Sequence, residues 1–410
     1  NDTPGKAKGE ETVMAKIRVA RTVEIPDALR ISRYRKIPEL GPRILFFSGG
    51  SALNGLCKTL KGYTHNSIHL VTPFDSGGSS AELRRAFDMP SIGDLRSRLM
   101  ALADESVLGH PEVYELFTYR LPKDLDNDDL RARLEAMALG KSERVADVPN
   151  PMRRLIRNQL GYFLDAMPQS FDLRGASIGN LILVGGYLNN HHHLDPIIYL
   201  FSKLVNVQGT VRAIVNDDLH LAADLADGTR VVGQHRLTGK EVMPLTSPIA
   251  RLYLSRQRDV FEPAEARLRK KNRKLIRNAD LICYPPGSFY SSVLANLIPA
   301  GVGQAVADND CPKVYIPNLG SDPEQVGMDF EHTVQALLGQ LRSDVADDCG
   351  NEKLLNFVLV DSSKGSYPEG LSAGFLRDLG IELIDVRLVS QHSAPYYDND
   401  LLVSALLSLT

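Results

Sequence analysis

The sequence has few cysteines and no apolar run of the length that a membrane span needs. Its four cysteines lie far apart and form no CxxC pair, so we expect neither a structural zinc site nor a disulfide framework. No apolar run approaches the roughly 20 residues that cross a bilayer. The N-terminus is polar and lacks the apolar core of a signal peptide. We therefore expect a cytoplasmic protein with no membrane partner, and, because it does not start with methionine, a processed or trimmed chain.

The sequence also lacks a strong charge of one sign. The formal net charge is −3 at pH 7, so no general attraction to nucleic acid is expected. Neither the GxSxG turn of serine hydrolases nor the HExxH motif of zinc proteases is present. With 410 residues, of which 43% are hydrophobic, the chain suits one large α/β domain with an insertion, or two domains.

Short apolar runs alternate with helical patterns at both ends of the chain, which is typical of a parallel sheet built from βαβ units. The predicted strands are residues 43–48, 67–72, 280–284, 313–316, 356–360 and 381–389. The predicted helices are residues 53–61, a helix from about residue 79, and 177–188, 196–207, 263–278, 288–298, 329–341, 374–379 and 400–407. We predict an α/β protein with a Rossmann-like three-layer αβα core and a mostly parallel sheet.

The middle and the N-terminus of the chain depart from this alternation. Residues 105–170 read as a helical insertion, and residues 208–255 as a small β-rich subdomain whose hairpin turns at residues 226–229. Residues 1–40 form an N-terminal extension before the α/β domain at 41–410. Within it we expect a disordered tail at 1–12, a strand at 16–25 and a solvated basic patch at 30–36.

Four polar turns follow predicted strands, and the carboxyl ends of parallel strands meet at one edge of a sheet. These turns are Ser48–Ser51, Asp75–Ser80, Pro285–Ser288 and Pro317–Gly320. A glycine turn before a helix presents free N–H groups and the positive end of the helix dipole to an anion. The sequence therefore predicts a phosphate site where the turns converge.

The glycine pair Gly49-Gly50 leaves two interpretations open: a tight turn that needs positive φ, or contact with a phosphate. Asp75 lies about 25 positions later, near the spacing at which a Rossmann acid holds a ribose hydroxyl. A nicotinamide enzyme is therefore a rival hypothesis. The GxGxxG fingerprint is incomplete, however, because the next glycine is Gly55.

Asp75 and Asp94 are the candidate catalytic and metal-binding residues. Two carboxylates together with substrate phosphates make a common Mg²⁺ site. The structural alternatives are a helix N-cap for Asp75 and, for Asp94, a helix-start acid paired with Arg96 or Arg98.

Two further polar features are ambiguous. Asn180 lies inside an apolar helix, where it could bind a ligand or a neighbouring backbone group. The segment His191-His192-His193 suggests a metal, but adjacent histidines point in different directions in regular structure. Its asparagine-rich surroundings favour a surface loop.

Taken together, these segments resemble the CofD/YvcK family, which includes 2-phospho-L-lactate transferases and gluconeogenesis factors. The matching segments are Gly49-Gly50-Ser51-Ala52, Asp75–Arg84, Ile92–Arg96, Gly179-Asn180-Leu181, Pro285–Ser292 and Asn318-Leu319. The motifs are nearer the YvcK branch and also resemble the CofD-like proteins of the GAK system. Ser76 stands where the pattern has a second aspartate, and Ala52, Ala81 and Pro285 stand where it has glycines.

The resemblance implies a Rossmann-like core, a homodimer and a cleft for a nucleotide diphosphate or nucleotide sugar. In the transferase branch it also implies a divalent metal, here Mg²⁺ on Asp75 and Asp94. The expected ligand-binding residues are Gly49, Gly50, Ser51, Gly77, Gly78, Ser79, Ser80, Arg96, Asn180, Gly287, Ser288, Tyr290 and Asn318, with Tyr290 stacked on or hydrogen-bonded to the ligand.

Three functions remain in contention at the level of sequence. The first is a binding protein or regulator for a nucleotide diphosphate ligand. The second is a metal-dependent transferase that moves a phospholactyl-type group from a nucleotide diphosphate carrier. The third, ranked well below both, is a nicotinamide oxidoreductase.

Overall fold

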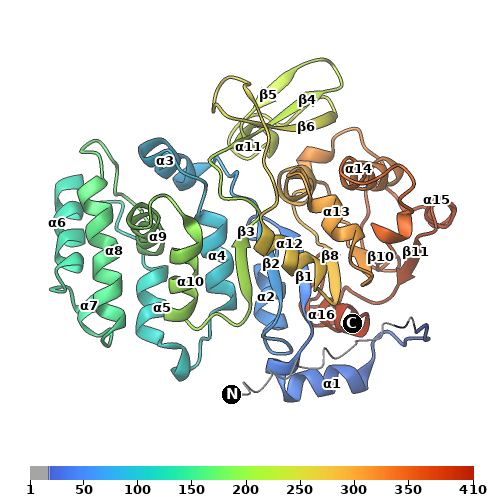
Figure 1. Cartoon of the computed structure of the whole chain (residues 1–410), viewed down its shortest axis with the longest axis horizontal. Coiled ribbons are helices and arrows are strands. Elements are labelled where there is room, and N and C mark those ends of the chain that lie inside the picture. Colours follow the sequence, from blue (N-terminus) through green and yellow to red (C-terminus); the bar gives the residue numbers. More distant parts are fainter. Residues whose placement is uncertain (1–16, 18) are drawn as a thin grey trace, which may run out of the picture.

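The computed structural model describes residues 17 and 19–410, and its core is a seven-stranded parallel sheet flanked by helices (Figure 1). The strand order is β11-β10-β9-β8-β1-β2-β3. The strands are β1 (Ile44–Ser48), β2 (Ile68–Val71), β3 (Thr210–Ala213), β8 (Leu281–Tyr284), β9 (Lys313–Tyr315), β10 (Phe357–Val360) and β11 (Glu382–Asp385). The chain builds outward from β1 to β3 and then returns to add β8 to β11 on the other side. This order confirms the Rossmann-like fold and puts the topological switch point between β1 and β8.

Strand β1 shows why the sequence forms a sheet that is covered on both faces. All five of its residues are buried. Ile44 and Phe46 belong to one hydrophobic core, and Leu45 and Phe47 belong to the other. Because side chains alternate across a strand, a continuous apolar run supplies both cores.

Helices cover both faces of the sheet (Figure 1). On the side of Ile44 the core includes residues of α2 (Asn54–Leu60), α3 (Gly78–Phe87), α4 (Gly93–Leu102), α9 (Ile178–Asn189), α10 (Leu194–Leu204) and α16 (Asn399–Ser408). On the side of Leu45 it includes residues of α12 (Lys270–Arg277), α13 (Val302–Ala307), α14 (Phe330–Arg342) and α15 (Ala373–Asp378). None of the helices in the described residues is long and apolar enough to cross a bilayer.

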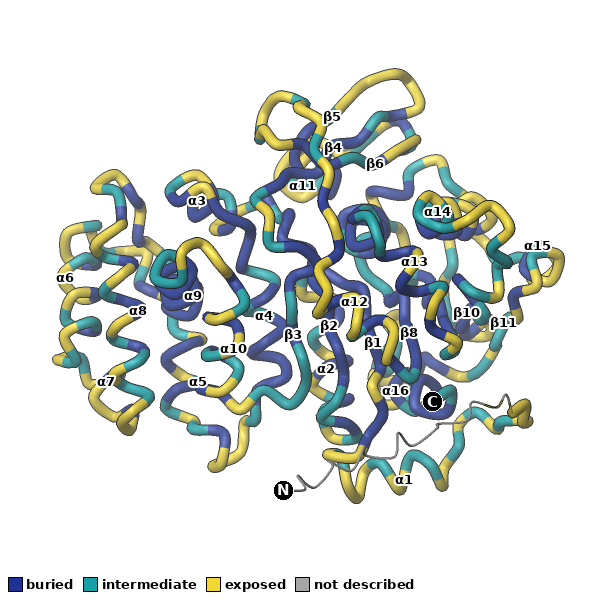
Figure 2. The backbone as a smooth tube through the Cα atoms, viewed as in Figure 1, coloured by how far each residue is buried: buried dark blue, intermediate teal, exposed yellow. Residues whose placement is uncertain are grey.

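The region of the predicted helical insertion contains α5 (Pro111–Thr118), α6 (Asn127–Ala138), α7 (Glu143–Ala146) and α8 (Met152–Ala166). These helices lie beside α9 at the left of Figure 1. In Figure 2 the outer helices α6 and α7 have many exposed residues, whereas the central strands β1, β2, β8 and β9 are buried and the edge strand β11 is not.

A four-stranded antiparallel sheet of order β5-β4-β6-β7 lies above the carboxyl ends of the main sheet (Figure 1). Its strands are β4 (His220–Leu225), β5 (Arg230–Val232), β6 (Ile249–Ser255) and β7 (Pro263–Ala264), and α11 (Gln234–Leu237) follows β5. The predicted turn at residues 226–229 does join β4 to β5. Two boundaries were wrong: β3 pairs with β2 in the main sheet, and the helix expected from residue 263 starts only at Lys270, because residues 263–264 pair with β6.

Other elements differ from the predictions as well. Residues 19–25 form no strand, and the basic patch lies on α1 (Ala28–Lys36), a helix with no buried residue. The tail at 1–12 lies outside the described residues. Strand β11 ends at Asp385, because the carboxylate of Asp361 accepts the N–H groups of Leu388 and Val389, both at 2.9 Å. The helix predicted at 288–298 is a π-helical turn at Phe289–Val293 followed by a 3₁₀ turn at Leu294–Leu297.

Candidate functional site

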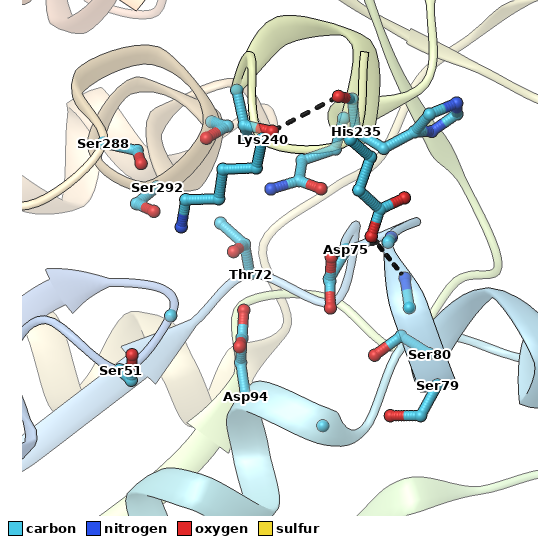
Figure 3. A pocket seen from close by; sticks show the side chains of 18 of the residues that line it. Ser51, Thr72, Asp75, Ser79, Ser80, Asp94, His235, Lys240, Ser288 and Ser292 are labelled. Carbon is cyan, nitrogen blue, oxygen red and sulfur yellow. Dashed lines mark hydrogen bonds between the residues drawn. The ribbon is translucent and has the colours of Figure 1, made fainter. Parts of the chain in front are cut away.

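A cavity of about 360 Å³ opens at the carboxyl ends of β1, β2 and β8, at the switch point of the sheet. We call it the main pocket (Figure 3). Its lining comprises Gly50, Ser51, Thr72, Asp75, Gly77, Gly78, Ser79, Ser80, Gly93, Asp94, Arg96, Arg120, Asn180, Gln234, His235, Thr238, Lys240, Glu241, Ser288, Ser291 and Ser292. Turns that are far apart in the sequence therefore do converge, as expected from strand order.

Most of the residues predicted for the site line this cavity. Those that do are Gly50, Ser51, Asp75, Gly77, Gly78, Ser79, Ser80, Asp94, Arg96, Asn180 and Ser288. Those that do not are Gly49, Gly287, Tyr290 and Asn318.

The carboxylates of Asp75 and Asp94 point toward each other across the main pocket (Figure 3). Asp94 lies in the first turn of α4. Burial, and next the charge of Asp75, raise the pKa of the Asp94 carboxyl to about 6, although the backbone amide of Gly50 opposes this rise. The ionised pair is therefore strained at neutral pH and would be relieved by a cation.

The ion pair with Arg96 or Arg98, which was the structural alternative for Asp94, does not form. The Nε of Arg96 donates to Oδ1 of Asn180 at 2.9 Å. The fully buried Arg98 instead donates from Nη1 to Ser48 Oγ at 2.7 Å and from Nη2 to the Gly50 carbonyl at 3.1 Å. Arg98 thus fixes the Gly50 turn from behind.

The π-helical turn after β8 does not offer free amides to a ligand, which corrects one predicted phosphate cradle. The N–H of Phe289 donates to Asp322 at 2.8 Å, and the N–H groups of Tyr290 and Ser291 both donate to Glu324 at 2.9 Å. Burial, and next the charge of Asp322, raise the pKa of Glu324 to about 7. Two carboxylates of the chain itself therefore hold this turn, which offers hydroxyl groups to the main pocket.

Carboxylates also accept two of the N–H groups at the N-terminus of α3. The Gly77 N–H donates to Asp75 Oδ1 at 3.1 Å, and the Gly78 N–H donates to Glu241 Oε1 at 2.8 Å. The structural alternative for Asp75 was a helix N-cap. Asp75 does accept an N–H group beside the start of α3, but the N-cap residue is Gly77. Glu241 is exposed and comes from the loop after α11, so an incoming anion would have to displace it from Gly78.

The four predicted residues outside the cavity contact other parts of the protein. Tyr290 is buried, and its hydroxyl donates to the Ile249 carbonyl at 3.2 Å, so it does not face the main pocket and cannot stack on a ligand there. Asn318 spans the turn after β8, with bonds of 2.7 Å to both the N–H and the carbonyl of Gly287. A Cβ at Gly49 would lie 2.8 Å from Thr72 Oγ1, so this position needs glycine for close packing.

Three cations face the main pocket without a carboxylate within ion-pair distance among the described residues: Arg96, Arg120 and Lys240. In Figure 3 the Lys240 side chain extends toward Thr72 and Ser292. Cations without a neutralising carboxylate in a polar cavity favour an anionic ligand.

Half of the lining residues that sequence reasoning missed come from the segment after β5: Gln234, His235, Thr238, Lys240 and Glu241. The others are Thr72, Gly93, Arg120, Ser291 and Ser292. The Oγ of Ser76 accepts the His235 N–H at 3.1 Å and lies 2.8 Å from its Nδ1, so this bond ties the segment to the turn after β2. Nothing in the spacing of the segment signals that it lies over the cavity.

The described residues offer few ligand sets for a metal ion. Across the described part of the chain, no group of three or more His, Cys, Asp or Glu side chains is arranged to bind a metal ion. His191 and His192 adopt positive φ in a turn between α9 and α10, as expected for a surface loop. Mg²⁺ needs only one or two carboxylates when substrate phosphates supply further oxygens, so Asp75 and Asp94 fit it.

Comparison with known proteins gives consistent results. The sequence model of the family described as "2-phospho-L-lactate transferase CofD" matches residues 44–373. The gluconeogenesis factor of Bacillus subtilis is 27% identical over 374 residues, covering 88% of this chain and 93% of that protein. The gluconeogenesis factor of Listeria monocytogenes is 28% identical over 364 residues, covering 84% and 88%. A relative from Nostoc is 29% identical over 334 residues, or 80% of this chain, and the match spans only 56% of that relative.

A solved structure supports the fold. The crystal structure of a member of the UPF0052 family from Bacillus halodurans superimposes with a TM-score of 0.64 at 24% identity. The match covers 90% of this chain and 99% of that one.

Proposed function

The chain belongs to the CofD family, and from this premise we propose that its main pocket binds a nucleotide diphosphate ligand, in particular a nucleotide sugar, and that the protein acts as a binding protein or regulator. The observation that carries the proposal is the placement of Arg96, Arg120 and Lys240 around one polar cavity at the switch point. Relatives that cover most of the chain are named gluconeogenesis factors, not transferases.

The ligand is expected to use side chains rather than amides for most of its contacts. Arg96, Arg120 and Lys240 would meet the diphosphate charge. The hydroxyls of Ser51, Ser79, Ser80, Ser288 and Ser292 would hydrogen-bond phosphate or sugar oxygens. We propose that the protein does this as a homodimer, a state that light scattering measures directly.

A metal-dependent transferase is the second candidate, and the facing carboxylates favour it. Asp75 and Asp94 would hold Mg²⁺, which would neutralise charge on the diphosphate bridge. An acceptor hydroxyl would form a bond to the phosphorus of the carried group while the phosphoanhydride bond breaks, and the nucleoside monophosphate would leave with the negative charge. Asp94, whose pKa lies near 6, is suited to accept the hydroxyl proton.

Thermal-shift measurements with UDP-glucose, UDP, GDP and NAD, each with and without Mg²⁺, test the proposal. A ligand at 100 times its Kd should stabilise the protein by about 2.7 kcal/mol. Stabilisation by UDP-glucose without Mg²⁺ supports the binding protein. A strict need for Mg²⁺, lost in Asp75→Asn, supports the transferase, and a response to NAD alone supports an oxidoreductase and overturns both.

A further inference from the structure

A second cavity of about 530 Å³ opens beside the main pocket, and we call it the side pocket. Its walls come from α3, the loop after α5 and the segment that enters α9. The two cavities share Ser79, Arg120 and Asn180. A molecule in the side pocket would therefore lie next to a molecule in the main pocket.

The acidic side chains of the side pocket are already neutralised. Asp172 is held by Arg174 through a bidentate pair, with Nε to Oδ1 at 2.9 Å and Nη2 to Oδ2 at 2.8 Å. Glu82 accepts from Arg85 Nη1 at 3.0 Å. The charges of each pair cancel, so the net charge of the cavity is set by its remaining cations.

Those remaining cations are Arg120 and Lys123. Neither has a carboxylate within ion-pair distance in the part of the chain that the structure describes. Arg120 Nη1 donates to the Gly175 carbonyl at 3.1 Å, which fixes the guanidinium at the border of the two cavities. The side pocket is therefore positively charged.

A nearby arginine strengthens this local field. Burial, and next the charge of Arg120, lower the pKa of Arg96 to about 10. Arg96 is oriented by Asn180 and passes close to Gly179, where a Cβ would lie 2.9 Å from its Cδ. Two guanidinium groups thus repel each other at the border, and an anion there would relieve the repulsion.

The N-terminus of α9 adds to the positive potential of the side pocket. Ser177 caps this 12-residue helix and lines the side pocket, so the positive end of the helix dipole lies at its wall. Another part of the lining is apolar and consists of the buried residues Leu83, Phe171 and Leu181. The cavity combines a cationic rim with an apolar wall.

We propose that the side pocket binds a second small molecule, an organic anion that carries a phosphate or carboxylate group and an apolar or aromatic part. The acidic group contacts Arg120 and Lys123, and the apolar part lies against Leu83 and Phe171. The proposal rests on the proposed function only in that this second ligand lies beside the nucleotide ligand of the main pocket.

Ligand-observed NMR titrations with three probes test this assignment. Phenyl phosphate carries both features, inorganic phosphate only the charge, and benzyl alcohol only the ring. We expect phenyl phosphate to bind most tightly of the three and to remain bound when the main pocket is filled with UDP. The charge reversal Lys123→Glu should weaken phenyl phosphate by about tenfold, because it places like charges together.

The control is Lys141→Glu, the same change at an exposed lysine between α6 and α7, which should leave binding unchanged. UDP titrations of the same variants keep the two proposals apart. If UDP fails to bind but phenyl phosphate binds in a Lys123-dependent way, the side pocket stands and the nucleotide proposal fails. Absence of phenyl phosphate binding, its displacement by UDP, or equal binding by Lys123→Glu overturns the side pocket.

Discussion

Replacing Asp94 by asparagine should make the protein more stable at neutral pH while it removes a group needed for cation binding. Asp94 is half-buried beside Asp75, and its pKa rises from 3.8 to about 6. Because the folded state holds the proton more tightly than the unfolded chain, ionisation weakens folding. The penalty is absent below the unfolded pKa, grows as pH rises toward about 6, and is complete above it.

The magnitude follows from the two pKa values. At pH 7.5 the penalty is about 3 kcal/mol, and at pH 5 it is roughly half of that. Asparagine carries no charge and keeps an oxygen that the Gly50 amide can reach, so it escapes the penalty. For a chain of this length, ~3 kcal/mol corresponds to a rise of about 3–4 °C in Tm.

Thermal melts of wild type and Asp94→Asn at pH 5.0 and 7.5 provide the measurement. Asp124→Asn makes the same chemical change at an exposed loop position before α6 and should leave Tm unchanged at both values. If Asp94→Asn lowers Tm at pH 7.5, or raises it equally at pH 5.0 and 7.5, the carboxylate of Asp94 is not strained and this reasoning is refuted.

Three further predictions concern the same pocket. Glu241→Gln should tighten UDP binding by about fivefold in calorimetry, since a weaker acceptor then competes for the Gly78 amide, a contact of about 1 kcal/mol; unchanged affinity would mean that phosphate does not approach α3. Tyr290→Phe should lower Tm slightly through loss of the bond to Ile249, about 1 kcal/mol, yet leave the Kd for UDP unchanged; a large loss of affinity would return Tyr290 to the site. If Mg²⁺ strengthens nucleotide binding, its effect should grow as pH rises through about 6, because protons compete for Asp94 below that value; a flat profile would remove Asp94 from the metal site.

The core of the fold could be predicted from the sequence because its signals are local and strong. The run at residues 43–48 is apolar throughout, and only a strand covered on both faces uses such a run over so short a length. Alternation of such runs with helical patterns then gives parallel order, and the turns after β1, β2 and β8 meet at one edge as expected. The strand proposed at 16–25 is absent from the described residues 19–25, because mixed composition gives no information on whether a partner strand exists.

The details of the site were less predictable because they depend on long-range contacts. Glycine turns before helices suggested free amides, but the acids that occupy them lie far away in sequence: Glu324 holds the turn at Tyr290, and Glu241 holds Gly78. Tyr290 matched a family motif, yet the π-helical turn directs its hydroxyl to β6. The motif therefore predicts that the loop after β8 lies at the site, but it does not predict where each side chain of the loop points.

The carboxylates around the main pocket also bear on how an anion can be recognised there. In a phosphate cradle, backbone amides supply most of the donors. Here Glu324 is buried and Asp322 is half-buried beside the amides they accept from, so a ligand would have to displace two carboxylates to reach those amides. Only Glu241, which is exposed, can leave Gly78 at small cost. Charge recognition therefore falls mainly to Arg96, Arg120 and Lys240, of which Arg96 is held by Asn180 and Arg120 by the Gly175 carbonyl. These cations recognise the charge that all diphosphates share, so selectivity among nucleotides has to arise elsewhere in the lining.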